Sequence, residues 1–280
     1  ASSVRFDSIQ IFIYGMKSCV HHPMRALCID GKTVEVAWYG PAPGQAPTLV
    51  FLHEGLGCVS FWRDFPTRLA QATGCGAFVY SRVGYGKSDT CSLPRPISFM
   101  HDEGLDFFPK LIEAAGLQEH VLVGHSDGGS IALIYAGGTP ATGLRGLITE
   151  APHVFCEEVC TRSIHDIVTA YHDGDLRERL KKHHGSNVDC AFWDWADVWQ
   201  HPDFKQWNIE EYLPHIKVPL MIIQGEDDEY ATIAPVRALT RQAGAGAESL
   251  LLPDCKHSPH KDQEGRTLAA MVEFIRKVLR

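Results

Sequence analysis

Short apolar runs alternate with longer amphipathic segments along most of this chain. The runs are rich in Val, Ile, Leu and Phe, and several of them end in glycine. Residues 97–117 instead carry apolar side chains at helical spacing up to Gly116, and the C-terminal segment 268–280 shows the same spacing. This pattern predicts an α/β fold, with a mostly parallel, doubly wound sheet flanked by helices. The expected strands are residues 33–40, 48–55, 76–84, 120–126, 144–152, 219–228 and 249–255.

Residues 155–215 break this alternation. They contain no strong strand pattern, but they gather Trp193, Trp195, Trp199 and Trp207 between helix-like pieces. We predict a helical cap, or lid, inserted into a core domain made of residues 1–154 and 216–280. The tryptophans either anchor the core of the insertion or line a pocket beneath it, and both roles can hold together. Trp193 and Trp199 are our candidates for the pocket.

Composition narrows the class of partner. The 280 residues carry a net charge of −8 and no basic run, which argues against nucleic-acid or anionic-membrane partners. The apolar stretch within residues 1–19 is shorter than the roughly 20 residues of a membrane span and lacks a signal-peptide pattern. Nine scattered cysteines are typical of reduced thiols in the cytoplasm. The oligomeric state cannot be read from one chain.

The stretch "GHSDGG" at residues 124–129 is the most informative motif. It fits G-x-S-x-G, in which a serine occupies a sharp turn between a strand and a helix. The run "VLV" precedes it, and Ile131, Ile134 and Tyr135 follow at helical spacing. Gly124 and Gly128 allow the strand and the helix to approach closely. Ser126 is therefore the candidate nucleophile.

A serine nucleophile needs a base and an acid that orients the base. Two late segments supply them. The segment "MIIQGEDDEY" ends a strand pattern in Gly225 and three successive acids, and "LLPDCKHSPH" places His257 shortly after the next strand pattern.

With these motifs in chain order, residues 33–280 resemble the α/β-hydrolase fold family, in its serine-nucleophile, esterase-like branch. In that family the order is nucleophile, acid, histidine. The resemblance implies that Asp228, three residues after Gly225, is the acid and that His257 is the base. Asp227 and Glu150 remain alternative acids, Glu226 and Glu229 are expected to be solvated or structural, and His260 is an alternative base expected to face away.

Acyl transfer also needs two N–H donors for the developing oxyanion. One is expected from Asp127, directly after the nucleophile. The segment "LHEGLG" resembles the family's H-G-x motif but has Glu54 where glycine is usual. Gly55 takes the position of the second donor, with Glu54 and Leu56 as alternatives, unless residues 53–57 form only a tight turn. The "SRVGYGKSD" segment resembles a glycine-rich loop of the family, not a nucleotide-binding site.

These features predict a serine hydrolase that cleaves a carboxylic ester, or a related acyl bond, of a small and partly apolar substrate. Lactonase, thioesterase and carbon–carbon hydrolase activity are alternatives on the same residues. A cofactor-free peroxidase-like enzyme and a non-catalytic binding protein are alternatives of other classes. No cofactor or metal is expected, because "CEEVC" alone is a weak metal pattern. The other pocket candidates are His53, Glu54 and His125.

Overall fold

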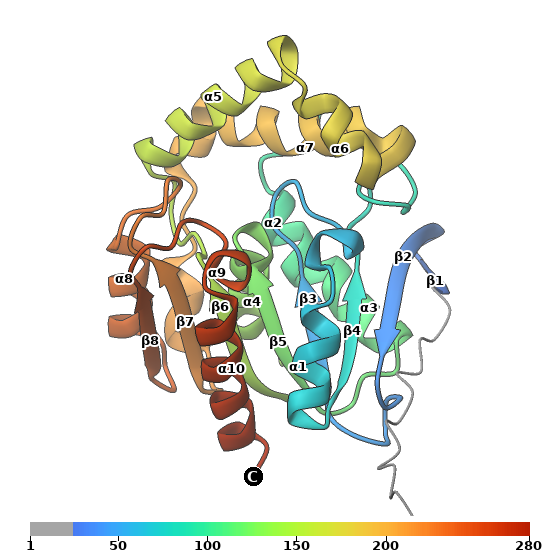
Figure 1. Cartoon of the computed structure of the whole chain (residues 1–280), viewed down its shortest axis with the longest axis vertical. Coiled ribbons are helices and arrows are strands. Elements are labelled where there is room, and N and C mark those ends of the chain that lie inside the picture. The colour runs from blue at the N-terminus through green and yellow to red at the C-terminus, as the bar shows by residue number, and fades with distance from the viewer. Residues whose placement is uncertain (1–24) are drawn as a thin grey trace, which may run out of the picture.

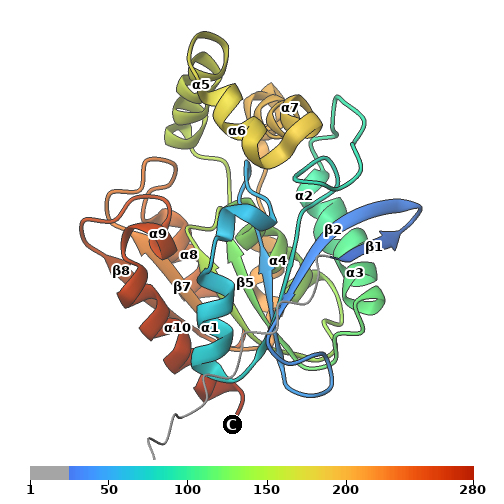
Figure 2. The ribbon, with the colours of Figure 1, turned by 45° about the vertical axis from the view of Figure 1, so that its right-hand side comes forward.

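A twisted sheet forms the centre of the molecule in the computed structural model, which describes residues 25–280 (Figures 1 and 2). The described strands lie in the order β1-β2-β4-β3-β5-β6-β7-β8. Neighbours from β4 to β8 pair in parallel, whereas β1 and β2 are antiparallel additions at one edge. The strand bounds are β1 Arg25–Ile29, β2 Lys32–Tyr39, β3 Thr48–Leu52, β4 Gly76–Tyr80, β5 His120–His125, β6 Leu144–Glu150, β7 Leu220–Gly225 and β8 Ala247–Leu252.

All seven expected strands are present, and β1 is an additional one. Its sequence, "RALCI", is short and begins with a charge, so it shows little strand pattern. It pairs with β2 through a turn at Asp30 and Gly31, whose φ angles are 49° and 76°. An Asp-Gly pair between two short runs is a strong hairpin signal, and this signal could have identified β1.

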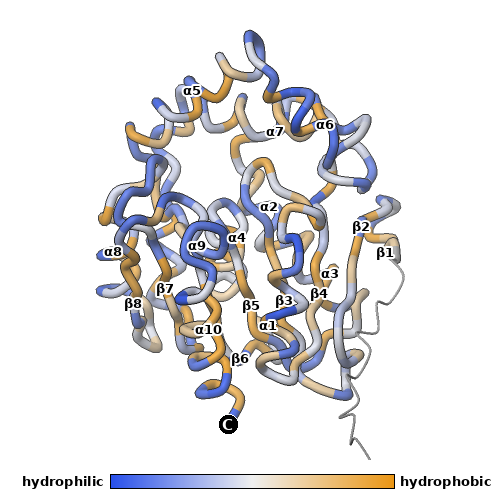
Figure 3. The backbone as a smooth tube through the Cα atoms, viewed as in Figure 1, coloured by the Kyte–Doolittle hydropathy of each residue, from blue (hydrophilic) through white to orange (hydrophobic). Residues whose placement is uncertain are grey.

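Helices cover both faces of the sheet, as expected for a doubly wound fold. Along β3, Leu49 and Phe51 pack toward α1 (Phe65–Thr73) and α10 (Glu264–Val278). Val50 and Leu52 pack on the opposite face, in the cluster that contains the other helices. In Figure 3 hydrophobic residues occur along the central strands, whereas helix α6 (Leu176–His184) is mostly hydrophilic. The helices of the second face are α3 (Phe108–Ala114), α4 (Asp127–Gly138) and α8 (Ala234–Gln242).

The helix expected at residues 97–117 is not one regular helix. It consists of α2 (Phe99–Asp102), a π-helical turn η2 (Glu103–Phe107) and α3. The turn lies against α4, where a Cβ at Gly104 would come 2.8 Å from Ile134. Glu103 at its start is buried and bonded to Arg95 at 2.7 Å. This packing and ion pair depend on distant residues, so helical periodicity did not predict the irregular turn.

A layer of three helices lies above the carboxyl ends of the strands in Figures 1 and 2. Loop residues after β4 bind it: Asn187 donates to the Ser88 carbonyl at 2.6 Å, and Arg95 pairs with buried Asp194 at 2.7 Å. Because these groups are buried, the contacts position the layer over the sheet. It comprises α5 (Glu158–Asp173), α6 and α7 (Val188–Gln200), and is followed by the turns η4 (Pro202–Gln206) and η5 (Glu210–His215).

The cysteines in the described part of the chain are free thiols. Cys91, in the loop after β4, has its Sγ 2.6 Å from that of Cys190 on α7. None of the helices from residue 25 onward is both long and apolar enough to cross a membrane. The N-terminal stretch 1–19, which we expected to carry no anchor, lies outside the described residues.

Three buried histidines predict that the free energy of unfolding decreases in mild acid. Burial lowers the pKa of His120 and of His184 from 6.5 to about 4, and that of His153 to about 3. The unfolded chain therefore binds more protons than the folded chain between about pH 6.5 and pH 4, so the free energy of unfolding decreases as pH falls through this window. Each histidine contributes a slope of up to about 1.4 kcal/mol per pH unit. Urea unfolding at pH 7.5 and pH 5 measures the free energy of unfolding, and His120→Gln should make it depend less steeply on pH. An equal free energy of unfolding at both pH values would contradict the prediction.

Candidate active site

Ser126 occupies a strained turn between β5 and α4. Its φ and ψ angles are 53° and −120°, a region that non-glycine residues rarely adopt. Glycines permit the close contact around it: a Cβ at Gly128 would overlap the Leu52 carbonyl oxygen, and one at Gly124 would collide with Gly128. The Ser126 N–H donates to the Glu150 carbonyl at 2.8 Å. The turn places the Ser126 hydroxyl at the carboxyl edge of the sheet.

Ser126, His257 and Asp228 form a continuous chain of hydrogen bonds. Ser126 Oγ lies 2.9 Å from His257 Nε2, and His257 Nδ1 lies 2.9 Å from Asp228 Oδ1. Asp228 Oδ1 also accepts the N–H groups of Tyr230 and Ala231, at 2.8 and 3.2 Å. Burial acts to raise the pKa of Asp228, but the bond to His257 and its charge hold that pKa below its usual value. An ionised Asp228 keeps the Nδ1 proton on the ring, which leaves Nε2 free to accept the serine proton.

The alternative acid Glu150 and the alternative base His260 bind each other. His260 Nδ1 and its backbone N–H both lie 2.9 Å from Glu150 Oε2, and both side chains are buried. Burial acts to raise the pKa of Glu150, but the charge of His260 and its hydrogen bond lower it. This second carboxylate–histidine pair therefore lies beside the Ser126 chain and is not part of it.

The remaining acids after β7 have different positions. Glu226 and Asp227 are exposed, and the structure shows no bond from either side chain to His257. Glu229 accepts the backbone N–H of His257 at 3.2 Å and borders the cavity above Ser126. Of the consecutive acids, only Asp228 bonds to the His257 ring.

The loop after β3 is held by Arg82, which is fully buried. Arg82 Nη1 donates to the His53 carbonyl at 2.6 Å, and Nη2 donates to the Glu54 carbonyl at 3.1 Å. These two bonds fix the backbone of the loop. The N–H groups of Gly55 and Leu56 bond to no acceptor within residues 25–280. A Cβ at Gly55 would overlap Trp195 Nε1, so glycine is required there. Sequence reasoning missed Arg82, although an arginine directly after a buried strand was a usable signal.

Glu54, which stands where the family usually has glycine, joins two segments. Its Oε1 lies 3.3 Å from Lys261 Nζ, and its Oε2 lies 3.6 Å from His125 Nδ1. Burial acts to raise the pKa of Glu54, but Lys261 and His125 hold it well below its usual value. His125 Nε2 donates to the His257 carbonyl at 2.7 Å. Glu54 and His125 thus connect the loop after β3 to the segment that carries His257.

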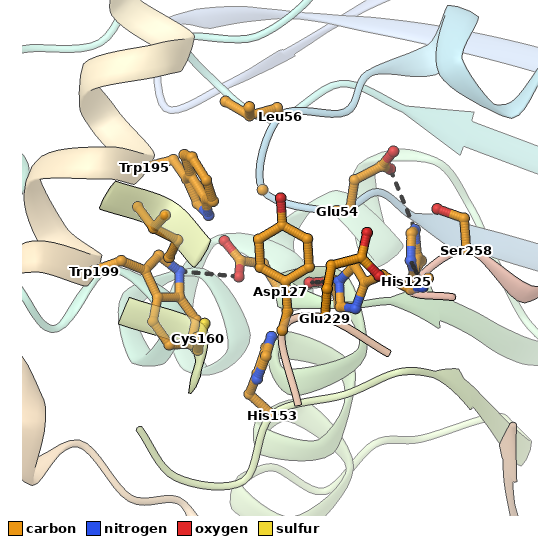
Figure 4. A pocket seen from close by; sticks show the side chains of 15 residues that line it. Glu54, Leu56, His125, Asp127, His153, Cys160, Trp195, Trp199, Glu229 and Ser258 are labelled. Atoms are coloured by element: carbon orange, nitrogen blue, oxygen red, sulfur yellow. Dashed lines mark hydrogen bonds and ion pairs between the residues drawn. The ribbon is translucent and has the colours of Figure 1, made fainter. Parts of the chain in front are cut away.

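Ser126 lines a cavity of about 250 Å³. Figure 4 shows the side chains around this cavity. Its floor contains Asp127 and His153, and α7 contributes Trp195 and Trp199 to its wall. The volume is at the small end for ligand sites, which suits a compact group. The other lining residues are Glu54, Gly55, Leu56, His125, Cys160, Ile164, Glu229, Tyr230, His257 and Ser258.

Two of the predicted pocket residues do not line this cavity. Trp193 packs against Tyr171 and His172 instead. Trp195 and Trp199 lie four residues apart on one face of α7, whereas a residue two positions before Trp195 points to another face. His53 is fully buried behind the loop, where its Nε2 accepts the Arg82 N–H at 3.1 Å, and burial lowers its pKa well below the usual value. Glu54, His125 and Trp199 do line the cavity.

No cluster of three or more His, Cys, Asp or Glu side chains with metal-binding geometry occurs in the part of the chain that the structure describes.

Comparison with known protein families decides the identity. Residues 49–270 match a family model described as "Alpha/beta hydrolase family". The chain belongs to the alpha/beta hydrolase family. This confirms the expected family and fold class, and it identifies the protein as a hydrolase. The match begins at β3 and ends within α10, so it includes Ser126, Asp228 and His257 of this alpha/beta hydrolase.

Solved structures with this fold include enzymes of several activities. A proline iminopeptidase from Mycobacterium smegmatis is 20% identical with a TM-score of 0.66, covering 91% of this chain and 98% of its own. An esterase from Exiguobacterium antarcticum is 17% identical with a TM-score of 0.69, covering 90% and 98%. A 2-hydroxy-6-oxo-6-phenylhexa-2,4-dienoate hydrolase from Rhodococcus sp. strain RHA1 is 15% identical with a TM-score of 0.74, covering 92% and 100%. No curated protein sequence matches the chain. At these identities the structural matches show only the fold.

Proposed function

We propose that this alpha/beta hydrolase is a serine hydrolase that cleaves a carboxylic ester of a small molecule through an acyl-enzyme. The observation that carries the proposal is the hydrogen-bond chain Ser126–His257–Asp228, with 2.9 Å at both links, beneath a cavity. A nucleophile, a base and an orienting carboxylate in this order are the minimum that acyl transfer requires.

In the first step Ser126 Oγ attacks the carbonyl carbon while its proton passes to His257 Nε2. The oxyanion accepts hydrogen bonds from the backbone N–H groups of Asp127 and Gly55, with Glu54 and Leu56 as alternative second donors. The carbonyl is restored when the alcohol leaves with the proton from Nε2. A water molecule then gives a proton to Nε2 and attacks the acyl carbon. The bond to Ser126 Oγ breaks, Oγ takes the proton back from Nε2, and the acid is released. Asp228 stabilises the charged ring throughout.

The cavity supports a compact, partly apolar acyl group. Trp195, Trp199, Ile164 and Leu56 provide apolar surface, and the volume of about 250 Å³ limits the size of that group. Lactones, thioesters and carbon–carbon bonds next to a carbonyl also present an electrophilic carbonyl carbon to Ser126. They are therefore alternative substrate classes for the proposed hydrolase. Fold similarity alone does not choose among them.

We further propose that residues 155–215 act as a cap on a core made of residues 1–154 and 216–280. The layer α5–α7 above the strand ends, and the contribution of α7 to the cavity wall, support this division (Figure 1). The free cysteines support a reducing, cytoplasmic location.

A fluorophosphonate probe tests the proposed nucleophile directly. The reagent should add one phosphonyl group to Ser126, which peptide mass spectrometry locates. The rate of p-nitrophenyl ester hydrolysis should fall in proportion to the fraction of protein that is labelled. Labelled protein that keeps its esterase activity, or a wild-type chain without an adduct at residue 126, would refute the mechanism. The latter outcome favours a non-catalytic binding protein.

Replacing Asp228 by asparagine should lower kcat for p-nitrophenyl acetate about 10⁴-fold. An amide donates to Nδ1 as readily as it accepts, so the ring loses its orientation and its charge is no longer stabilised. Asp227→Asn is the matched control, because that side chain is exposed one position earlier. Equal losses in the two variants would show that Asp228 is not the orienting acid.

A further inference from the structure

The Asp127 carboxyl is an unusual feature of the cavity floor. The residue is 1% exposed and lines the cavity directly after Ser126. Its Oδ1 accepts Trp199 Nε1–H at 3.2 Å, whereas Oδ2 has no hydrogen-bond partner within residues 25–280. Figure 4 shows the carboxyl directed toward the two tryptophans of α7. A buried carboxylate oxygen without a partner is costly, so its presence in a substrate cavity requires an explanation.

A structural ion pair does not provide that explanation. The cation that acts most strongly on Asp127 is Arg82, but Arg82 donates to the carbonyls of His53 and Glu54 and forms no ion pair with Asp127. Asp194 of α7 is equally buried, and it is paired with Arg95 at 2.7 Å. The fold thus pairs the buried acid that joins the layer to the core with a cation, whereas the acid next to Ser126, which also lines the cavity, has no ion-pair partner within residues 25–280.

The position of Asp127 restricts what can reach Oδ2. Its backbone N–H is the proposed oxyanion donor, so its side chain must lie close to the carbon atoms next to the scissile carbonyl. Burial raises the pKa of Asp127 to about 6, although Arg82 and the Trp199 bond act to lower it. The carboxyl is therefore mostly ionised above neutral pH and accepts hydrogen bonds there.

We propose that Asp127 Oδ2 selects substrates whose acyl chain carries a hydrogen-bond donor, a hydroxyl or an ammonium group, one or two carbons from the scissile carbonyl. This inference rests on the proposed serine hydrolase function and names its substrate class. An ester without the donor leaves Oδ2 desolvated and unpaired, so the enzyme binds it and its transition state less well.

Phenyl esters that differ only in the donor test this selection. Wild-type kcat/KM for phenyl 2-hydroxypropanoate, 3-hydroxypropanoate, 2-aminopropanoate or 3-aminopropanoate should exceed that for phenyl propanoate about 10- to 100-fold, as expected for a hydrogen bond to a charged group. Asp127→Leu should reduce the ratio to about one, because leucine offers no acceptor. Asp127→Asn should keep a preference for a hydroxyl, which an amide oxygen can accept, and lose that for an ammonium group.

Asp227→Asn is the matched control, because it removes an exposed carboxylate that does not line the cavity and should leave the donor ratio unchanged. A wild-type ratio near one for all four esters, or a ratio that survives Asp127→Leu, would overturn the inference. Calorimetric titration of the Ser126→Ala variant with the corresponding amides measures the donor preference without turnover. If no ester is cleaved but these amides still show the preference, the proposed reaction fails while the assignment of Asp127 stands; equal affinities would reject the assignment independently.

Discussion

Replacing Ser126 by alanine should lower kcat for p-nitrophenyl acetate about 10⁶-fold, to a rate set by residual binding and oxyanion stabilisation. The serine oxygen is the only group on this turn that lies 2.9 Å from His257 Nε2. Alanine leaves the ring in place but removes the atom that forms the acyl bond. The measurement is steady-state hydrolysis by protein purified from a host whose own esterases are absent.

The stability of the variant serves as the control for this experiment. Both side chains are small and both must adopt the φ of 53°, so thermal unfolding should stay close to that of the wild type. If alanine at residue 126 keeps more than about 1% of wild-type kcat, covalent catalysis by this serine is excluded, because even loss of one oxyanion donor costs as much.

Replacing His257 by alanine should produce a loss of similar size, about 10⁶-fold in kcat, because the serine then lacks a base. Added imidazole should restore part of the activity in the alanine variant, since the cavity is open at the position of the missing ring. The restored rate should follow the fraction of neutral imidazole as pH changes.

His260→Gln separates a catalytic role from a structural one. His260 is bonded to buried Glu150 at 2.9 Å and does not bond to Ser126. The variant should unfold at a lower temperature, because glutamine replaces the buried hydrogen-bond partner of Glu150, yet its kcat should fall far less than that of the residue 257 variant. If the two histidine variants lose activity equally and imidazole rescues neither, the assignment of the base is wrong.

Local patterns were sufficient for much of the fold. Strand-like runs predicted seven strands, and the structure adds β1, which its Asp-Gly turn signalled. The helical spacing of residues 97–117 correctly predicted helix. It did not predict the π-helical turn, because contacts of Gly104 and Glu103 with distant segments determine that turn. The strand order, with β4 between β2 and β3, follows from long-range pairing that periodicity does not encode.

In the candidate site, too, a local motif predicted one residue, whereas tertiary contacts decided the others. G-x-S-x-G is a local motif, because the turn needs glycines at fixed positions, and it identified Ser126 from the sequence alone. Among neighbouring acids and histidines, sequence reasoning left Asp227, Glu150 and His260 open. The choice between them depends on which side chains lie within 3 Å of each other across the sheet edge, and chain spacing does not measure that distance.

The sequence by itself therefore predicted the class of fold, the turn at Ser126 and the candidate reactive groups, since each prediction depends on a local pattern or motif. Only the tertiary structure paired Glu150 with His260, turned Trp193 away from the cavity and left the buried Asp127 Oδ2 without a partner within residues 25–280. These outcomes depend on how helices and strands pack, and packing brings together side chains that may be more than a hundred residues apart in sequence.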